Sequence, residues 1–213
     1  LEYCRKAMRA CEQAAAAPDA ARGDRVRLAA GYLDYGFKLA IAGYDRAGGL
    51  KNCRKSLDML AVLTKEDGSD RRLRRLESLA CSRTAELLEH DAAARPEALV
   101  LRRRSLDVVT RLLTLDAANS DYRRLGAYCS FELADALVAL EKMEEALPYY
   151  PRALATFDSL AGADPKNVQY RQDRASVRVH YGAALRKHAE PAKARDQYRQ
   201  AVSEMAEVAH IHP

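Results

Sequence analysis

The sequence predicts an all-α protein built from consecutive antiparallel helix pairs. Three observations support this: the composition, an internal repeat of about 48 residues, and the short breaks between helix-forming segments. Ala, Leu, Arg and Glu dominate the 213 residues, whereas Gly numbers only 10 and Val, Ile and Thr are sparse. This mixture favours helix over sheet. With 48% hydrophobic and 31% charged residues, the chain can bury a core, and disorder is not expected.

The clearest internal match joins residues 105–123 to residues 153–171, 48 positions further on. The alignment places Asp116 on Asp164 and Tyr122 on Tyr170. Self-similarity at a fixed period is the sequence signature of repeat architectures.

Fainter copies of the repeat extend towards the start of the chain. We therefore treat residues 1–213 as one repeat domain, with a partial repeat followed by four full repeats: 1–20, 21–68, 69–117, 118–165 and 166–213. The chain begins without Met or a signal-peptide pattern, so we expect it to be a fragment of a longer protein.

Each repeat is expected to hold two helices. In the last repeat the helices are predicted over residues 167–187 and 191–209, the second opened by Pro191. Pro96 is expected to open an earlier helix. The candidate N-caps are Ser69, Ser120 and Asn167. The predicted breaks are at Gly23, Gly43, Gly48-Gly49 and Gly68. Loops of two to five residues would make neighbouring helices antiparallel.

The stretch EEALPYYPRAL at residues 144–154 carries two prolines in a segment that otherwise reads as a helix. A proline in a helix interior removes a hydrogen bond and costs roughly 3 kcal/mol. If the helix begins near Met143, Pro148 lies one turn in and Pro151 falls on the same face. We expect both prolines to face outwards on a bent first turn. The alternative is that the helix begins at Pro151.

The same stretch resembles the second helix of a tetratricopeptide (TPR) repeat, through Ala146, Tyr150 and Ala153. The first-helix pattern resembles Tyr181-Gly182 with Leu185, and the turn that ends the unit resembles the segment DPKN that starts at Asp164. This resemblance implies a right-handed superhelical solenoid of about nine helices. The unit is longer than a standard TPR, which has about 34 residues. The long form is similar to TPR-like tails of bacterial serine/threonine protein kinases.

Small residues recur where the two helices of each pair would touch. Helix axes approach to about 8–10 Å only where the contacting side chains are small. The expected contact positions are Gly36, Ala85, Ala134 and Gly182 on the first helices, and Gly49, Ala98, Ala146 and Ala194 on the second helices.

The resemblance also implies a function, because the first helices of TPR solenoids line a concave groove that binds proteins or peptides. We expect a non-catalytic scaffold, part of a larger bacterial cytoplasmic protein. Projecting the register places ten residues in the groove: Leu33, Phe37, Ser82, Glu86, Glu89, Tyr128, Phe131, Asp135, Val179 and Arg186. For Tyr128 and Phe131 the alternative is that they pack within the elongated helices. Two alternatives stay open. The chain is the C-terminal part of a kinase whose catalytic domain lies upstream, or an oligomerisation module that pairs through uncapped end helices.

Other functions find little support. No kinase motif, phosphate-binding loop or nucleophile elbow is present, so we expect no catalytic residue and no cofactor. The five histidines and five cysteines have no metal-ligand spacing, and the cysteines are expected to be small buried thiols. No apolar run approaches the length of roughly 18 residues that a membrane-spanning helix needs. Two arginine clusters, residues 71–75 and 102–104, are interpreted as solvated helix faces, so no nucleic acid is expected.

Overall fold

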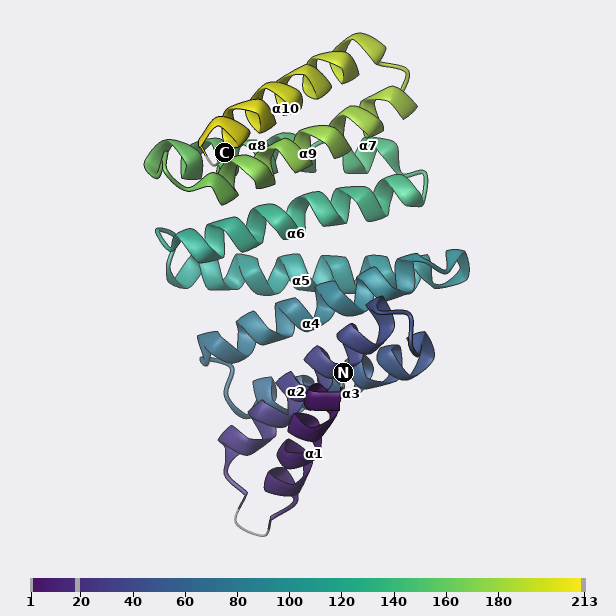
Figure 1. Ribbon diagram of the computed structural model, residues 1–213, viewed down its shortest axis with the longest axis vertical. Coiled ribbons are helices and arrows are strands. Elements are labelled where there is room, and N and C mark those ends of the chain that lie inside the picture. Colours follow the sequence, from purple (N-terminus) through teal and green to yellow (C-terminus); the bar gives the residue numbers. More distant parts are fainter. Residues whose placement is uncertain (1, 18–19, 212–213) are drawn as a thin grey trace. The chain divides into compact units, whose positions relative to one another are not determined.

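The computed structural model describes residues 2–17 and 20–211, with side chains up to residue 208. The ends of the predicted repeats 1–20 and 166–213 lie partly outside these residues. The described part contains ten α-helices, one short 3-10 helix and no strand (Figure 1). The elements are α1 (Glu2–Ala16), α2 (Arg22–Ile41), α3 (Arg46–Glu66), α4 (Arg71–Glu89), η1 (Ala92–Ala94), α5 (Arg95–Leu115), α6 (Ser120–Ala139), α7 (Met143–Ala146), α8 (Tyr149–Ala163), α9 (Val168–Lys187) and α10 (Pro191–Ile211). The predicted all-α fold class is confirmed, and α7 with α8 fills the place of one helix.

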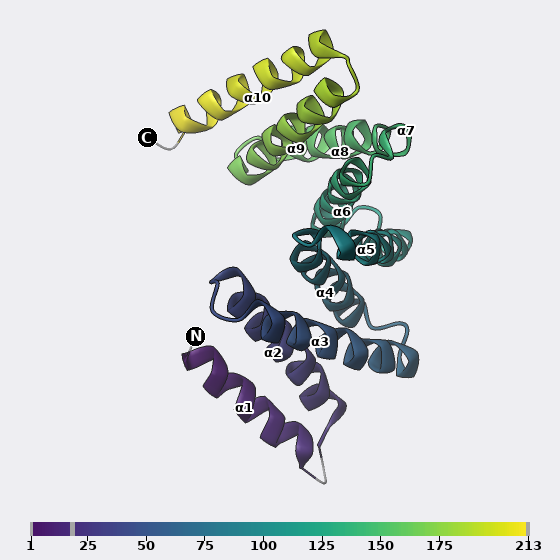
Figure 2. The same cartoon turned by 90° about the vertical axis from the view of Figure 1, so that its right-hand side faces the viewer.

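The chain divides into two compact units, one up to Leu112 and one from Leu113 onwards. In the first unit α1 packs on α2, α2 on α3 and α3 on α4. In the second unit α6 packs on α8, α8 on α9 and α9 on α10 (Figure 2). We call α2, α4, α6 and α9 the first helices and α3, α5, α8 and α10 the second helices. Within each unit the two first helices also contact each other, as α2 with α4 and α6 with α9. The division into repeats stays a prediction.

Glycines make a close contact between two helices of the first unit. A Cβ atom added to Gly36 of α2 would lie 2.6 Å from the carbonyl oxygen of Gly49 in α3, and the reciprocal distance is also 2.6 Å. In the second unit, a Cβ on Gly182 would lie 2.9 Å from the ring of Tyr198. All eight predicted contact positions are buried, which confirms the interpretation of the small residues.

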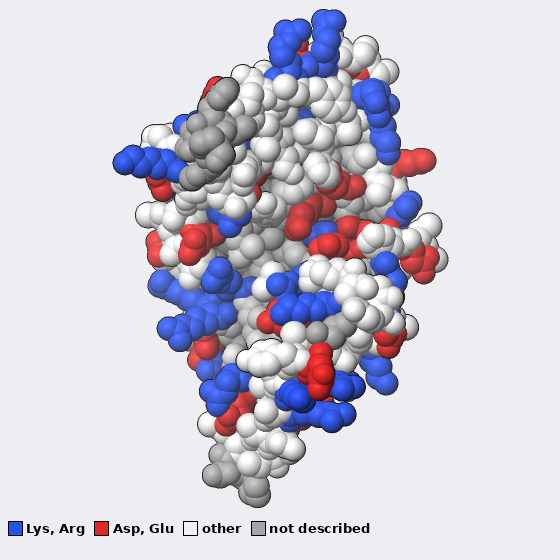
Figure 3. Space-filling model, in the orientation of Figure 1, with Lys and Arg blue, Asp and Glu red and all other residues white. Residues whose placement is uncertain are grey.

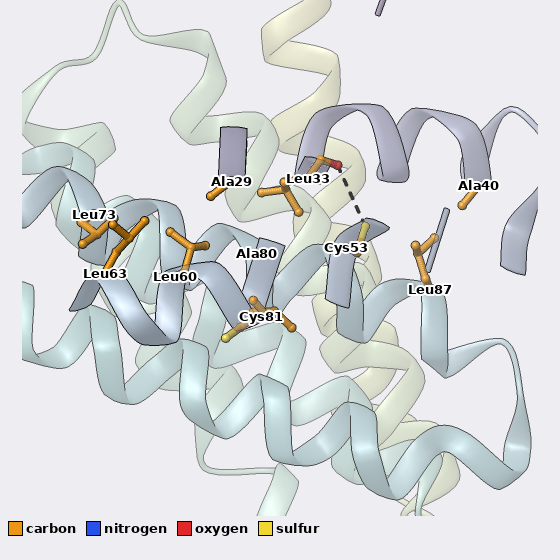
Figure 4. Close-up of a cluster of buried hydrophobic side chains, with 11 residues drawn as sticks. Ala29, Leu33, Ala40, Cys53, Leu60, Leu63, Leu73, Ala80, Cys81 and Leu87 are labelled. Carbon is orange, nitrogen blue, oxygen red and sulfur yellow. Dashed lines mark hydrogen bonds between the residues drawn. The ribbon is translucent and has the colours of Figure 1, made fainter. Parts of the chain in front are cut away.

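The core of the first unit is a layer of aliphatic side chains between α2, α3 and α4 (Figure 4). Leu33, Leu60 and Leu73 contribute one side chain from each helix and are almost fully buried. The Cys53 thiol, 4.0 Å from the carbonyl oxygen of Leu33, lies in the same layer, and burial raises its pKa to about 11. The expected buried thiols are confirmed for Cys53, Cys81 and Cys129, whereas Cys4 and Cys11 are half-buried.

Helix starts differ in detail from the sequence-based expectation. The N-cap of α4 is Asp70, one residue after the predicted Ser69, and the N-cap of α6 is Asn119, one residue before the predicted Ser120. Both caps accept backbone N–H groups of the first turn, and a carboxylate or amide oxygen reaches these groups as well as a hydroxyl does. Asn167 is the N-cap of α9 and Pro191 opens α10, as predicted.

Two of the predicted glycine breaks are wrong. Gly23 lies in the first turn of α2 and Gly48-Gly49 in the first turn of α3. At Gly48 the helix turn brings the backbone against its cap, since an added Cβ would meet the carboxylate of Asp45. Gly43, with φ of +73°, and Gly68 do lie between helices, as predicted.

Two first helices end on a left-handed residue that is not glycine. Glu141 after α6 has φ of 59° and Ala189 after α9 has φ of 60°. In each case the next N–H, of Lys142 or Glu190, donates across the turn to a carbonyl oxygen of the helix at 2.9 Å. This is the Schellman arrangement, and its recurrence at equivalent positions of the last two repeats agrees with the internal match in the sequence.

The two prolines of residues 144–154 break one helix into α7 and α8. Pro148 is the N-cap residue of α8, and Pro151 lies in its first turn, where a missing N–H costs little. Both prolines are exposed, as predicted. The alternative start at Pro151 is wrong by two residues, because α8 begins at Tyr149. None of the described helices is both long and apolar enough to span a lipid bilayer.

Two glycines of α2 give a matched stability test. We expect Gly36→Ala to lower the free energy of unfolding by about 1–3 kcal/mol, because its methyl group collides with the backbone of α3. Gly31→Ala is the control, since the nearest atom to its Cβ is 3.9 Å away, and it should stabilise by up to about 1 kcal/mol. Urea denaturation of both variants checks this. Equal effects would contradict the close contact.

Candidate protein-binding faces

The exposed sides of the first helices are the candidate binding surfaces. In the second unit we call the surface of α6 and α9 the α6–α9 face, defined by Tyr128, Asp135, Val179, His180 and Arg186. Figure 3 shows acidic side chains gathered over α6 on this face.

A buried carboxylate joins α6 to α9. Asp173 of α9 is only 2% exposed and accepts hydrogen bonds from three side chains. Arg124 donates from Nε to Oδ2 at 2.6 Å, Tyr128 from its hydroxyl to Oδ1 at 2.7 Å, and Gln169 from Nε2 at 2.8 Å. The Arg124 guanidinium also lies 5.4 Å from the centre of the Tyr128 ring. Burial, followed by the bond to Asp173, raises the pKa of Tyr128 to about 12, so the hydroxyl stays a donor.

A second carboxylate, Asp135 of α6, is fixed by two partners. Its Oδ1 accepts from the Tyr150 hydroxyl of α8 at 2.6 Å, and its Oδ2 pairs with Nδ1 of His180 in α9 at 2.6 Å. The bond to Asp135 raises the pKa of His180, and burial raises the pKa of Tyr150. The carboxylate of Asp135 therefore links α6 to both α8 and α9 at this face.

Aromatic rings fill the space between these two polar links. The ring of Phe131 lies 5.3 Å from that of Tyr128 and 5.6 Å from that of His180, measured between centroids. Phe131 itself is buried. It therefore supports the face from below, where its ring holds Tyr128 and His180 in place.

In the first unit, the predicted groove residues of α2 and α4 have different surroundings. Leu33 is buried in the core, and Phe37 is half-buried beneath the guanidinium of Arg83, 5.0 Å from its ring centre. Ser82 is within hydrogen-bond distance of the Ser105 hydroxyl, at 3.3 Å. Ser105 is fully buried, as the repeat register predicts.

Two ion pairs that the sequence did not reveal link α4 to α5. Arg102 is 4% exposed and binds both carboxylate oxygens of Glu89, at 2.8 and 3.1 Å. Arg104 donates to Glu77 at 2.6 and 3.0 Å. The interpretation of the cluster 102–104 as a solvated face is therefore wrong for Arg102, because its charge is buried and paired.

The repeat register could have revealed part of the second pair. Ser105 occupies a buried contact position and donates to the carbonyl oxygen of Ser78 between α4 and α5. In an antiparallel helix pair the residue numbers of facing positions keep a constant sum, so Arg104 lies opposite the turn of α4 that contains Ser78. The register therefore places Arg104 near this turn, but it does not select Glu77 as the partner.

The ten predicted groove residues thus fall into three groups. Leu33 and Phe131 are buried. Five are half-buried and make contacts within the protein: Phe37, Ser82, Glu89, Tyr128 and Asp135. Three are exposed and available to a partner: Glu86, Val179 and Arg186. Among the described residues, no group of three His, Cys, Asp or Glu side chains is placed to hold a metal ion.

Removing the charge of Asp173 should destabilise the second unit. We expect Asp173→Asn to lower the free energy of unfolding by about 1–3 kcal/mol, because the Arg124 bond loses its charged acceptor. The control is Asp158→Asn, whose carboxylate is half-exposed beside Arg174 and should contribute less than about 1 kcal/mol. Chemical denaturation of both variants measures the difference, and a smaller loss for Asp173→Asn would contradict the network.

The His180–Asp135 pair should contribute to stability in a pH-dependent way. Because folding raises the pKa of His180 above its ordinary value of 6.5, the contribution is complete below about pH 6 and is lost as pH rises through the folded pKa. His180→Ala should therefore cost more at pH 5.5 than at pH 9, by less than about 1 kcal/mol since the ring is nearly half exposed. His90→Ala is the control, and a pH-independent difference would refute the pairing.

Comparison with solved structures supports the fold. A crystal structure of MamA, a TPR-like helical protein, is similar to this chain with a TM-score of 0.51 and 13% identity, covering 95% of this chain and 89% of that chain. MamA from Desulfovibrio magneticus RS-1 matches with a TM-score of 0.32 and 14% identity over 88% and 98% of the two chains, which is too low to support an argument. No family model and no curated protein sequence matches the chain. The likeness to MamA supports a TPR-like helical fold and, at this identity, nothing further.

Proposed function

We propose that this chain is a non-catalytic scaffold that binds a protein or peptide on the exposed sides of its first helices, chiefly on α9. The observation that carries the proposal is the exposed pair Val179 and Arg186 on that helix, which we call the α9 row. Val179 is 46% exposed, and a β-branched residue in a helix interior brings no gain in helix propensity. An exposed valine on the same helix as an exposed cation suits a partner with an apolar side chain and a carboxylate.

The surroundings of this row favour binding because they are already ordered. Asp135 holds His180 and Tyr150, and Asp173 holds Arg124 and Tyr128, through hydrogen bonds of 2.6–2.7 Å. A partner that docks on fixed side chains pays little for ordering them. The same reasoning extends the proposal to Glu86 on α4, which is exposed in the first unit.

The experiment is a capture from source-cell lysate with three baits, quantified by mass spectrometry. One bait is the unchanged chain, and the second carries Val179→Asp with Arg186→Glu. The third is a control with the same charge change on exposed residues elsewhere, Val100→Asp with Arg152→Glu. We expect partners of the first bait to be retained by the control and reduced at least about tenfold on the α9 variant. Equal capture by all three folded baits would refute the α9 row as the binding surface.

A second candidate function is oligomerisation through α10. Val202 and Met205 are 70% and 45% exposed, whereas Leu154 and Phe157, at the same repeat positions of α8, are 7% and 0% exposed. The helix α8 is covered by the next first helix, α9, which packs against it. If α10 pairs between copies, Val202→Asp should lower the mass measured by light scattering at high concentration.

The link to a kinase, the bacterial source and the cytoplasmic location stay predictions from the sequence.

A further inference from the structure

Three arginines at the start of α4 form an exposed cluster, which we call the arginine patch: Arg71, Arg72 and Arg75. Figure 3 shows basic side chains gathered over this end of α4. Among the residues that the structure describes, no carboxylate oxygen lies within 4.0 Å of these three guanidinium groups. The patch is therefore a concentrated positive charge without an internal counter-ion.

Several arginines elsewhere in the first unit are neutralised. Arg25 pairs with Glu66 at 2.8 Å, Arg54 with Glu97 at 2.7 Å, and Arg104 with Glu77 at 2.6 Å. Arg74, next to the patch, donates its Nε to the carbonyl oxygen of Gly68 at 2.6 Å, which satisfies the donor but leaves the charge in place. The three arginines of the patch are instead exposed.

The position of the patch is unfavourable unless an anion approaches. The positive end of the helix dipole and the like charges of Arg71 and Arg75, four residues apart, both oppose it. The helix end itself offers no binding site, because Asp70 already accepts from the backbone N–H groups of Arg72 and Leu73 at 2.9 and 3.1 Å. Any ligand must therefore be held by the guanidinium groups.

The geometry of an α-helix sets the size of the ligand. At about 100° and 1.5 Å per residue, the three arginines lie within an arc of about 100° and a length of about 6 Å. One turn beyond Arg75, Leu79 continues the same row and is only partly buried against the core. The patch thus matches a few closely spaced carboxylates followed by an apolar side chain.

We propose that the arginine patch of α4 binds an acidic segment of a partner protein, with carboxylates on Arg71, Arg72 and Arg75 and an apolar residue against Leu79. A protein segment fits better than nucleic acid for two reasons. Residues 71–81 contain no aromatic side chain on which a base could stack. The carboxylate of Asp70 borders the patch, and it would repel the continuous phosphate charge of a duplex.

The test uses the full chain and a fluorescein-labelled peptide with a run of glutamates followed by leucines, read by fluorescence anisotropy. The triple variant Arg71→Glu, Arg72→Glu, Arg75→Glu should weaken binding at least about tenfold. The matched control Arg152→Glu, Arg195→Glu, Arg199→Glu has the same net charge and exposed positions, and it should change affinity less than about twofold. Circular dichroism checks that both variants are folded.

Three results would overturn the proposal. They are undetectable binding of the glutamate peptide by the unchanged chain, equal weakening by the two triple variants, and tighter binding of duplex DNA than of the peptide at the same patch. A matched peptide with glutamine in place of glutamate should not bind. The proposal does not depend on the α9 row, since Val179→Asp with Arg186→Glu should leave binding of this peptide unchanged.

Discussion

The architecture depends on close contact between paired helices at small residues. In the first unit the two backbones come so near at Gly36 and Gly49 that a single methyl group would meet a carbonyl oxygen at 2.6 Å. In the second unit Gly182 accepts the ring of Tyr198 in the same way. The two helices of each pair cross at the point where their small residues meet. Larger side chains can then interlock on either side of this point.

Close pairing also places polar side chains within reach of the neighbouring helix. The Ser56 hydroxyl donates to the carbonyl oxygen of Ala29 at 2.7 Å, and Ser105 donates to that of Ser78 at 3.0 Å, with the same separation along the chain. A buried hydroxyl without such a partner would be costly. The repeat therefore combines a hydrogen bond from serine with the close helix contact at the small residues. The hydrogen bond fixes the register of the two helices, and the close contact fixes the distance between them.

The sequence predicted the parts of the structure that follow from periodicity. The buried state of Ala134 and Ala194 and the start of α10 at Pro191 required only the repeat and simple helix rules. The partners of most charged side chains could not be predicted in this way. Whether Arg102 is solvated or buried against Glu89 depends on how far two side chains reach across a specific crossing. The sequence left open whether Phe131 lines the groove or packs within the helices, because the repeat is longer than a standard TPR and its register is less certain; Phe131 is buried.

The two arginines Arg75 and Arg124 show how one repeat position can serve two purposes. The predicted repeat aligns them, and each lies in the early part of a first helix. Arg124 is neutralised by Asp173 at 2.6 Å and so holds α6 to α9. Arg75 has no carboxylate oxygen within 4.0 Å among the described residues, so its charge remains exposed to solvent. Both arginines lie on first helices that pack through small residues at equivalent positions, Ala85 and Ala134, so the fold accommodates either outcome. The charge that each repeat exposes can therefore change from one repeat to the next by the gain or loss of a single carboxylate, while the helix contacts at the small residues stay the same.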